Sequence, residues 1–148
     1  MHPPLADRLA LEDLMVAYCY AVDALDDLDA LLALFTADAE LDFSAIGLPV
    51  LRGRTEMRRF YQGVFADMRH HTHCLTNFQV EQYRPERAVT RAYVHGLGID
   101  RRGTAVEVHV RYRMECRLAP AGWRIARYWI TPGMPLPGDL AAVHGDRY

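Results

Sequence analysis

Residues 104–118, TAVEVHVRYRMECRL, decide the class of fold that this chain adopts. From Val106 to Leu118 every second side chain is apolar or aromatic, while charged residues and His109 stand between them. Side chains along a β-strand point alternately to opposite faces of a sheet, so this period of two predicts a long strand. We expect one face of the strand to be buried and the other to meet solvent.

Three further stretches have the character of strands: HCLTNFQVEQY at 73–83, RAVTRAYVHGLGI at 87–99 and GWRIARYWIT at 122–131. The connections between the four strands are RPE, DRRG and APAG. Connections this short join antiparallel neighbours. The sequence therefore predicts a four-stranded antiparallel meander in the second half of the chain.

The first half of the chain has helical spacing instead. Leu14, Tyr18 and Val22 recur at every fourth position, which predicts a helix from about Leu5 to Ala24. The acidic cluster around Asp27 then supplies an N-cap for a short second helix. The remaining elements expected are that helix at 29–35, a strand at 39–47 and a third helix at 55–68. Helices that precede a meander predict the α+β class.

Length and composition favour a single domain. The chain has 148 residues, of which 51% are hydrophobic, and this is enough for one core without a disulfide or a structural metal. We expect one domain over residues 1–148, with a core at about 5–131 and a C-terminal tail at 132–148.

The charge pattern and the N-terminal sequence argue against several kinds of partner. The formal charge is −2, and the 17 basic residues are scattered among 19 acidic ones, so we expect no nucleic-acid surface. The N-terminus lacks a cationic start followed by an apolar run, and no stretch of eighteen uncharged apolar residues occurs. We expect a soluble, cytoplasmic protein that does not bind membranes.

Missing residue types narrow the possible chemistry further. All 17 basic residues are arginine, which excludes a lysine Schiff base and a Walker-type phosphate loop. The cysteines, Cys19, Cys74 and Cys116, are far apart and form no CxxC pair, so neither a disulfide framework nor a thiolate zinc site is expected. There is also no GxSxG motif for a nucleophilic serine.

Asp23 and His73 are the candidate acid–base pair. Asp23 ends the apolar face of the first predicted helix, and His73 begins a predicted strand, where its side chain is well placed to point inward. A carboxylate that accepts a hydrogen bond from an imidazole fixes its tautomer and stabilises the imidazolium, so that the other ring nitrogen serves as a general base. Alone, each residue is more often solvated or structural, so this prediction requires that the two meet.

The other histidines of RHHTHC (69–74) have weaker claims to a role in catalysis. His70 and His71 fall at the end of the third predicted helix or in its loop, and we expect them to be bystanders or rim contacts. If the strand extended back to His71, then His71 and His73 would share a face, as in some sites for first-row metals. No third ligand has convincing spacing, and His109 lies on the charged side of its strand. We therefore expect no metal site.

Several aromatic side chains are candidates for contact with a substrate. Tyr18, Tyr20 and Tyr112 lie on faces expected to point inward, where a phenol can donate a hydrogen bond to a carbonyl oxygen as its charge grows. Packing in the core is the alternative for each of them. Trp129 on the last strand is a further candidate, although its position leaves open which face it occupies.

The order of these motifs resembles the SnoaL-like branch of the NTF2-like superfamily. The matching stretches are LEDLMVAYCYAVDALDDLDALLALFTADAELDF at 11–43, LRGRTEMRRFY at 51–61, HHTHCLTNFQVE at 70–81 and GWRIARYWI at 122–130. The resemblance implies a cone in which a curved antiparallel sheet wraps around N-terminal helices. It also implies a deep apolar pocket and, usually, a dimer formed through the sheet.

Within this branch the chain is similar to scytalone dehydratase, hexachlorocyclohexane dehydrochlorinase and bile acid 7α-dehydratase. These enzymes use an aspartate and a histidine, without metal or organic cofactor, to remove a proton and expel water or chloride. The resemblance assigns the aspartate to Asp23, the histidine to His73 and a pocket tyrosine to Tyr18.

The sequence departs from scytalone dehydratase at three pocket positions. A pocket histidine of that enzyme corresponds approximately to Ile99 in this chain. A pocket phenol corresponds to Phe43, and a pocket asparagine corresponds to Tyr112. The identity of the substrate and the handling of its leaving group therefore do not carry over from that enzyme.

Together these features predict a lyase of the dehydratase type, without cofactor or metal, acting on a hydrophobic polycyclic, polyketide or steroid-like molecule. The alternatives are an isomerase or polyketide cyclase with the same pair, and a non-catalytic ligand-binding protein or oxygenase partner subunit. We expect a homodimer or a higher homo-oligomer. The expected catalytic residues are His73, Asp23 and Tyr18, and the expected substrate-binding residues are Tyr20, Tyr112, Phe43 and Trp129.

Overall fold

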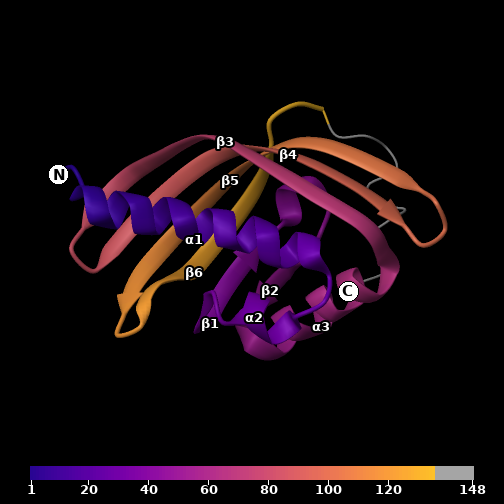
Figure 1. Cartoon of the computed structure of the whole chain (residues 1–148), viewed down its shortest axis with the longest axis horizontal. Helices are drawn as coiled ribbons and strands as arrows, with labels where there is room; N and C mark the ends of the chain where they lie inside the picture. The colour runs from indigo at the N-terminus through magenta and orange to yellow at the C-terminus, as the bar shows by residue number, and fades with distance from the viewer. Residues whose placement is uncertain (136–148) are drawn as a thin grey trace.

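The computed structural model describes residues 1–135, in which three α-helices pack against one six-stranded sheet. In chain order the elements are α1 (Leu5–Ala24), α2 (Leu28–Leu32), β1 (Phe35–Asp42), the 3₁₀ turn η1 (Ser44–Ile46), β2 (Val50–Arg52), α3 (Gly53–Asp67), β3 (Met68–Arg84), β4 (Arg87–Asp100), β5 (Ala105–Ala119) and β6 (Gly122–Pro132). Figure 1 shows the sheet arching over α1, with α2 and α3 at the end that carries β1 and β2. This curved α+β architecture confirms the predicted fold class.

The predicted meander is present, but the sheet is mixed rather than antiparallel throughout. Its strand order is β2-β1-β6-β5-β4-β3, and the neighbours from β3 to β6 are all antiparallel. The exception is β1, which pairs with β6 in parallel, so that Leu41 lies beside Tyr128. Short connections force neighbouring strands to run antiparallel, whereas β1 and β6 are far apart in the chain and are free of that constraint.

Irregularities in β3 contribute to the curvature of the sheet. The pairing of β3 with β4 shifts register in three places, one of them between Thr76 and Gln79, where Asn77 has a φ of 57°. An extra residue in one strand bends that strand and increases its twist. The bent strand covers α1 and leaves a concave inner face for the core.

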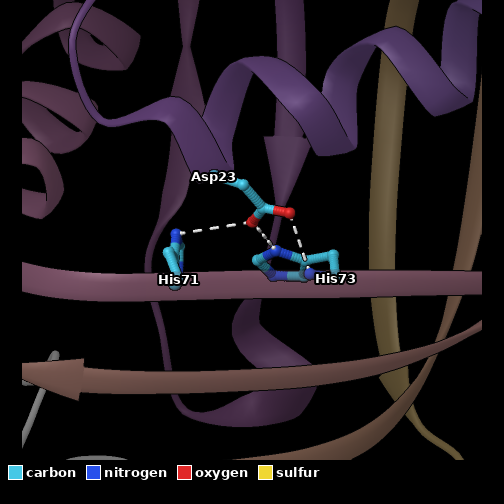
Figure 2. A group of neighbouring side chains, drawn as sticks. All are labelled: Asp23, His71 and His73. Carbon is cyan, nitrogen blue, oxygen red and sulfur yellow. Dashed lines mark hydrogen bonds and ion pairs between the residues drawn. The ribbon is translucent and has the colours of Figure 1, made fainter.

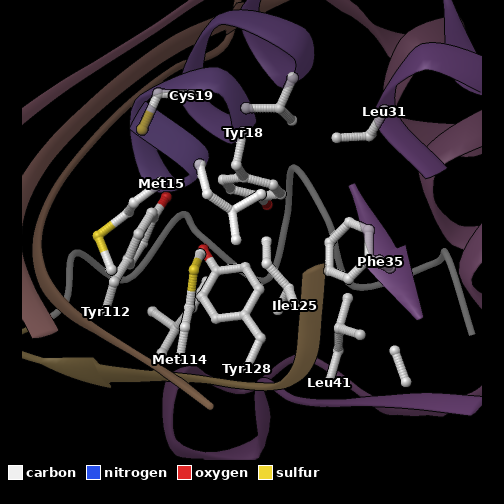
Figure 3. Packing of buried hydrophobic residues seen from close by; sticks show 14 of the residues in the cluster. Met15, Tyr18, Cys19, Leu31, Phe35, Leu41, Tyr112, Met114, Ile125 and Tyr128 are labelled. Atoms are coloured by element: carbon white, nitrogen blue, oxygen red, sulfur yellow. The ribbon is translucent and has the colours of Figure 1, made fainter. Parts of the chain in front are cut away.

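The inner face of α1 supplies one side of this core. Its buried side chains are spaced by three and one residues in turn, which places them on a single helical face. Figure 3 shows Tyr18 from this helix packed beside Tyr112 and Tyr128 of the sheet. The buried residues of α1 are Leu11, Leu14, Met15, Tyr18, Cys19 and Val22.

The alternation in β5 is confirmed up to Met114. Val106, Val110, Tyr112 and Met114 are buried, but Leu118 is 45% exposed although the simple alternation predicted it to be inside. The pairing with β6 shifts register between Glu115 and Cys116, so consecutive residues are buried there and the alternation ends.

The boundary between α3 and β3 differs from the prediction. The sequence predicts a helix to residue 68, with His70 and His71 at its end or in the following loop, but α3 ends at Asp67 and β3 begins at Met68. Both histidines therefore lie within the strand. The second helix is also shorter than predicted, because Phe35 already begins β1.

The predicted C-terminal tail lies mostly outside the described residues. Pro132 still belongs to β6, and residues 133–135 continue along the sheet, where the N–H of Gly133 donates a hydrogen bond to the carbonyl of His109. Among the helices within residues 1–135, none has the length and apolar character needed to cross a membrane.

Candidate active site

Asp23 and His73 meet where the C-terminal turn of α1 faces β3 (Figure 2). Asp23 Oδ1 lies 2.5 Å from His73 Nδ1, and Asp23 Oδ2 accepts a hydrogen bond of 2.9 Å from the backbone N–H of His73. Because an ionised carboxylate only accepts hydrogen bonds, we assign the ring proton to Nδ1. His73 Nε2 is then left with a lone pair, which is the arrangement expected of a general base.

The position of Asp23 on its helix also matters. The last turn of α1 contains no basic residue, and the C-terminal end of a helix carries partial negative charge. A carboxylate there is unfavourable by itself, but a positively charged imidazolium beside it is stabilised by both the carboxylate and the helix end. The side chains of Asp23 and His73 are only 21% and 13% exposed, so water screens this interaction weakly.

His71 also belongs to the site, although the sequence predicted it to be a bystander or a rim contact. It lies two residues before His73 on the same face of β3, and its side chain is 10% exposed. His71 Nδ1 lies 3.1 Å from the carbonyl oxygen of Val22, which can only accept, so this nitrogen also carries a proton. The same nitrogen is 3.9 Å from Asp23 Oδ1, and the two imidazole rings meet edge to face at 4.7 Å. The signal in the sequence was the i, i+2 spacing, which became informative only once the strand was known to begin at Met68.

Both histidines line a cavity between the sheet, α1 and α3. The cavity encloses about 90 Å³ and is mostly apolar. Its polar lining consists of the two imidazoles and the phenols of Tyr18, Tyr61 and Tyr112. The apolar lining residues are Val22, Phe43, Ile46, Leu48, Phe60, Val64, Val106, Val108, Val110 and Ile130, together with the β4 segment 96–98.

A pair of buried phenols lies inside this cavity. The hydroxyl oxygens of Tyr18 and Tyr61 are 2.9 Å apart. Burial above all raises the pKa of each phenol well above its usual range, so both remain protonated. Only one of the two protons is needed for the mutual hydrogen bond, and the other O–H is able to donate to a ligand. The sequence predicted Tyr18 and Tyr112 at the cavity but did not single out Tyr61, which looked like one more core residue of α3.

Tyr20 and Trp129 lie outside the cavity, which corrects the expectation that they line it. Tyr20 is 76% exposed, because it is two positions from Tyr18 and therefore faces the opposite side of the helix. Trp129 follows the inward-facing Tyr128 and so lies on the outer face of the sheet. Its ring contacts the guanidinium groups of Arg113 and Arg127, at 5.1 and 5.7 Å from the ring centre. Phe43, the remaining predicted contact, does line the cavity.

Two glycines of β4 make room for the imidazoles. Gly96 pairs with His73 and Gly98 pairs with His71. A Cβ atom on Gly96 would lie 3.3 Å from His73 Cδ2, and one on Gly98 would lie 3.3 Å from His71 Cδ2. Each ring therefore leans over a position without a side chain. A single sequence shows such glycines but not which side chain lies over them.

Asp23, His71 and His73 also offer three possible metal ligands whose donor atoms lie within 4.8 Å of one another. Both Nδ1 atoms are already hydrogen bonded, one to Asp23 and the other to the carbonyl of Val22. A cation bound at these atoms would have to displace both protons. The geometry thus fits a hydrogen-bonded acid–base pair better than a metal site.

The buried thiols do not suit nucleophilic catalysis. Desolvation raises the pKa of Cys19 and of Cys116 to about 12 in each case. Since the thiolate is the reactive form, neither sulfur is a nucleophile near neutral pH.

The profile of the SnoaL-like domain family matches residues 3–128, which is most of the chain. The chain belongs to the SnoaL-like family. Among curated proteins, none matches it. A crystal structure from Novosphingobium aromaticivorans, provisionally named an aromatic ring hydroxylase, is 46% identical and covers 96% of this chain and 99% of its own, with a TM-score of 0.93.

More distant structures share the fold. A protein from Novosphingobium aromaticivorans provisionally named a scytalone dehydratase is 21% identical over 88% of this chain and 86% of its own, with a TM-score of 0.80. A ketosteroid isomerase-like protein from Erwinia carotovora atroseptica is 22% identical over 89% of this SnoaL-like chain and 100% of its own, with a TM-score of 0.74. At these identities the likeness shows a shared fold.

Proposed function

We propose that this SnoaL-like protein is a cofactor-independent lyase that eliminates water or halide from a hydrophobic small molecule. The observation that carries this proposal is the 2.5 Å contact between Asp23 Oδ1 and His73 Nδ1 at the wall of an apolar cavity. A neutral imidazole held in this way is a base whose conjugate acid is stabilised by the adjacent carboxylate.

In the proposed reaction, His73 Nε2 removes a proton from a carbon next to a carbonyl group. The electrons of that C–H bond form a new C=C bond, and the bond from the neighbouring carbon to its hydroxyl oxygen breaks. The imidazolium returns the proton to the departing oxygen, so that water leaves and His73 is neutral again. Asp23 keeps its negative charge throughout and stabilises the transient imidazolium.

The phenol pair has a role of its own in this proposal. Negative charge grows on the carbonyl oxygen as the proton is removed, and a buried hydrogen-bond donor stabilises that charge. The O–H that Tyr18 and Tyr61 do not use between themselves is such a donor. Tyr18 is therefore proposed as a catalytic residue, as the sequence predicted, and Tyr61 as its partner.

The size of the cavity limits how a substrate binds. Its 90 Å³ is smaller than the roughly 300–1,000 Å³ usual for ligand sites. A polycyclic substrate must therefore either spread the lining apart or present only its reacting ring to His73. Phe43 and Tyr112 are proposed to contact that ring.

Two other functions use the same residues. In an isomerase or cyclase, the imidazolium returns the proton to carbon and nothing leaves, and the second imidazole of His71 beside the base would support such a transfer. In a partner subunit of an oxygenase, the cavity would bind a ligand without reacting with it. The observation behind this last function is the name of the 46% identical relative, an aromatic ring hydroxylase.

The experiment is incubation with a panel of hydrophobic β-hydroxy and β-halo ketones, followed by mass measurement of the products. A lyase yields products lighter by one water or one hydrogen halide, whereas an isomerase yields products of unchanged mass. For a turned-over compound, His73→Asn and Asp23→Asn should each reduce the rate by about 10² to 10⁴. Tyr20→Phe, which changes an exposed phenol of the same helix, is the matched control and should leave the rate unchanged.

Full activity in both the His73 and the Asp23 variant would contradict the assignment of the base. Binding of the ketones without any product would instead favour the partner-subunit function.

We also propose that the chain forms a homodimer, as the family resemblance implies. Light scattering at micromolar concentration tests this, and a uniform monomer mass would contradict it.

A further inference from the structure

A second group of histidines lies on the opposite face of the sheet from the cavity. His95 of β4 pairs directly with His109 of β5, and their rings are stacked, with centres 4.4 Å apart and planes 6° from parallel. Glu107 stands two positions before His109 on the same face. Gly96 follows His95 in β4, Val108 lies between Glu107 and His109 in β5, and both line the cavity. Neighbouring residues of a strand point to opposite faces of the sheet, so the side chains of His95, Glu107 and His109 point outward.

The donor atoms of the three residues are close together. Glu107 Oε1 lies 2.7 Å from His95 Nε2, a hydrogen bond whose one proton a bound ion would displace, and 3.9 Å from His109 Nε2. All three donor atoms fit within 4.8 Å. Zinc binds imidazole nitrogen and carboxylate oxygen at about 2.0–2.2 Å, which in a tetrahedral shell places neighbouring donors about 3.3–3.6 Å apart. The two distances to Glu107 lie on either side of that range.

The site is also accessible and adjustable. In a single chain the side chains of His95, Glu107 and His109 are 37%, 58% and 50% exposed, so an ion can reach them from solvent unless two chains associate through this face of the sheet. Exposed side chains change rotamer at little cost, which allows the two rings to turn from their stacked arrangement until both Nε2 lone pairs point at one ion. Two imidazoles with one carboxylate form a set that suits first-row divalent cations and leaves a position for water.

We propose that His95, Glu107 and His109 bind one first-row divalent cation, with Zn²⁺ as the representative ion. All three ligands come from one chain, so the site needs no second copy. The site is separate from the proposed lyase chemistry, because His95, Glu107 and His109 do not line the cavity. Failure of the proposed activity therefore has no bearing on this site.

One nearby residue has to be removed from the test. Cys74 pairs with His95 across β3 and β4, and its thiol is free and exposed. Thiolates bind zinc by themselves, so the measurement starts from Cys74→Ser. In that background, calorimetric titration with Zn²⁺ should show saturable binding of one ion per chain. His95→Asn or His109→Asn should weaken this binding by at least about tenfold, because each removes a direct ligand.

Two further variants control for other histidines. His70→Asn removes an exposed imidazole of β3 and should leave zinc binding unchanged. Asp23→Asn disrupts the three possible ligands in the cavity and should also leave it unchanged. As a second measurement, zinc should shift the ¹⁵N signals of His95 and His109 but not those of His71 and His73.

Absence of saturable zinc binding in Cys74→Ser would overturn the proposal. So would binding that survives in His109→Asn but disappears in Asp23→Asn, since the ion would then lie in the cavity.

Discussion

The substitutions Gly98→Ala and Gly96→Ala should differ in their cost in stability and in their effect on His73. A Cβ atom on Gly98 would lie 2.6 Å from Met68 Cε, whereas carbon atoms in contact are about 3.5–4.0 Å apart. Met68 is 1% exposed, so its methyl group has no solvent into which to move. Overpacking costs about 1–3 kcal/mol, and the lower entropy of the unfolded alanine chain offsets about 0.4–1 kcal/mol. We expect Gly98→Ala to lower the free energy of unfolding by about 1–2 kcal/mol.

Gly96→Ala should behave differently. The added Cβ would lie 3.2 Å from Val108 Cγ2, 3.3 Å from His73 Cδ2 and 3.5 Å from His73 Nε2. Shifts of a few tenths of an ångström relieve these contacts, so the loss of stability should stay below about 1 kcal/mol. The displaced atoms, however, belong to the proposed base. We expect a changed His73 imidazole environment and lower turnover despite nearly normal stability.

Urea unfolding with an unchanged m-value gives the two free energies, and long-range ¹H–¹⁵N spectra report the imidazoles. Thr72→Ala is the matched control, because Thr72 is exposed and lies between His71 and His73 on the other face of β3. This substitution should alter neither the His71 nor the His73 ring signals. A loss of stability in Gly96→Ala as large as that in Gly98→Ala, or unchanged His73 signals in Gly96→Ala, would contradict this prediction.

Two further predictions concern other parts of the molecule. With a thiol reagent at pH 8, the folded protein should react quickly at one of its three cysteines, the exposed Cys74, since Cys19 and Cys116 are buried with a pKa of about 12. Fast reaction of a second thiol before unfolding would contradict this. At the β4–β5 turn, burial works to raise the pKa of Asp100, but hydrogen bonds from Thr104 and Arg102 outweigh it and hold this pKa below 3.8. Asp100→Asn should therefore be less stable than the native sequence at pH 7, and the difference, measured by thermal unfolding, should vanish as the pH falls through the lowered pKa.

The sequence predicted the parts of the fold that depend on local patterns. The alternation in β5 located a half-buried strand, and the short connections located the meander, because both effects act between neighbouring residues. The pairing of β1 with β6 depends on contacts between distant segments, and no local pattern shows it. The end of the alternation at Glu115 has the same origin, since it follows from a register shift against β6.

The candidate site shows the same division. Asp23 and His73 could be predicted because Asp23 lies in the last turn of the first helix, because His73 precedes an apolar stretch, and because the family resemblance pairs them. His71 was misplaced because the apolar pattern of α3 continues into Met68, although the helix ends one residue earlier. The prediction that Tyr20 lines the cavity is wrong because the aromatic residues clustered in this part of the sequence lie on two faces of the helix. The face of the sheet that Trp129 occupies could be assigned only once Tyr128 was known to point inward.

The proposed function depends on Asp23 holding the proton of His73 on Nδ1, which leaves Nε2 as a base in the cavity. Long-range ¹H–¹⁵N correlation spectra of the histidine rings test this without a substrate. We expect neutral His73 to be protonated at Nδ1, with a strongly downfield Nδ1–H resonance that disappears in Asp23→Asn. A His73 ring protonated at Nε2, or one whose signals ignore the change at Asp23, would contradict it.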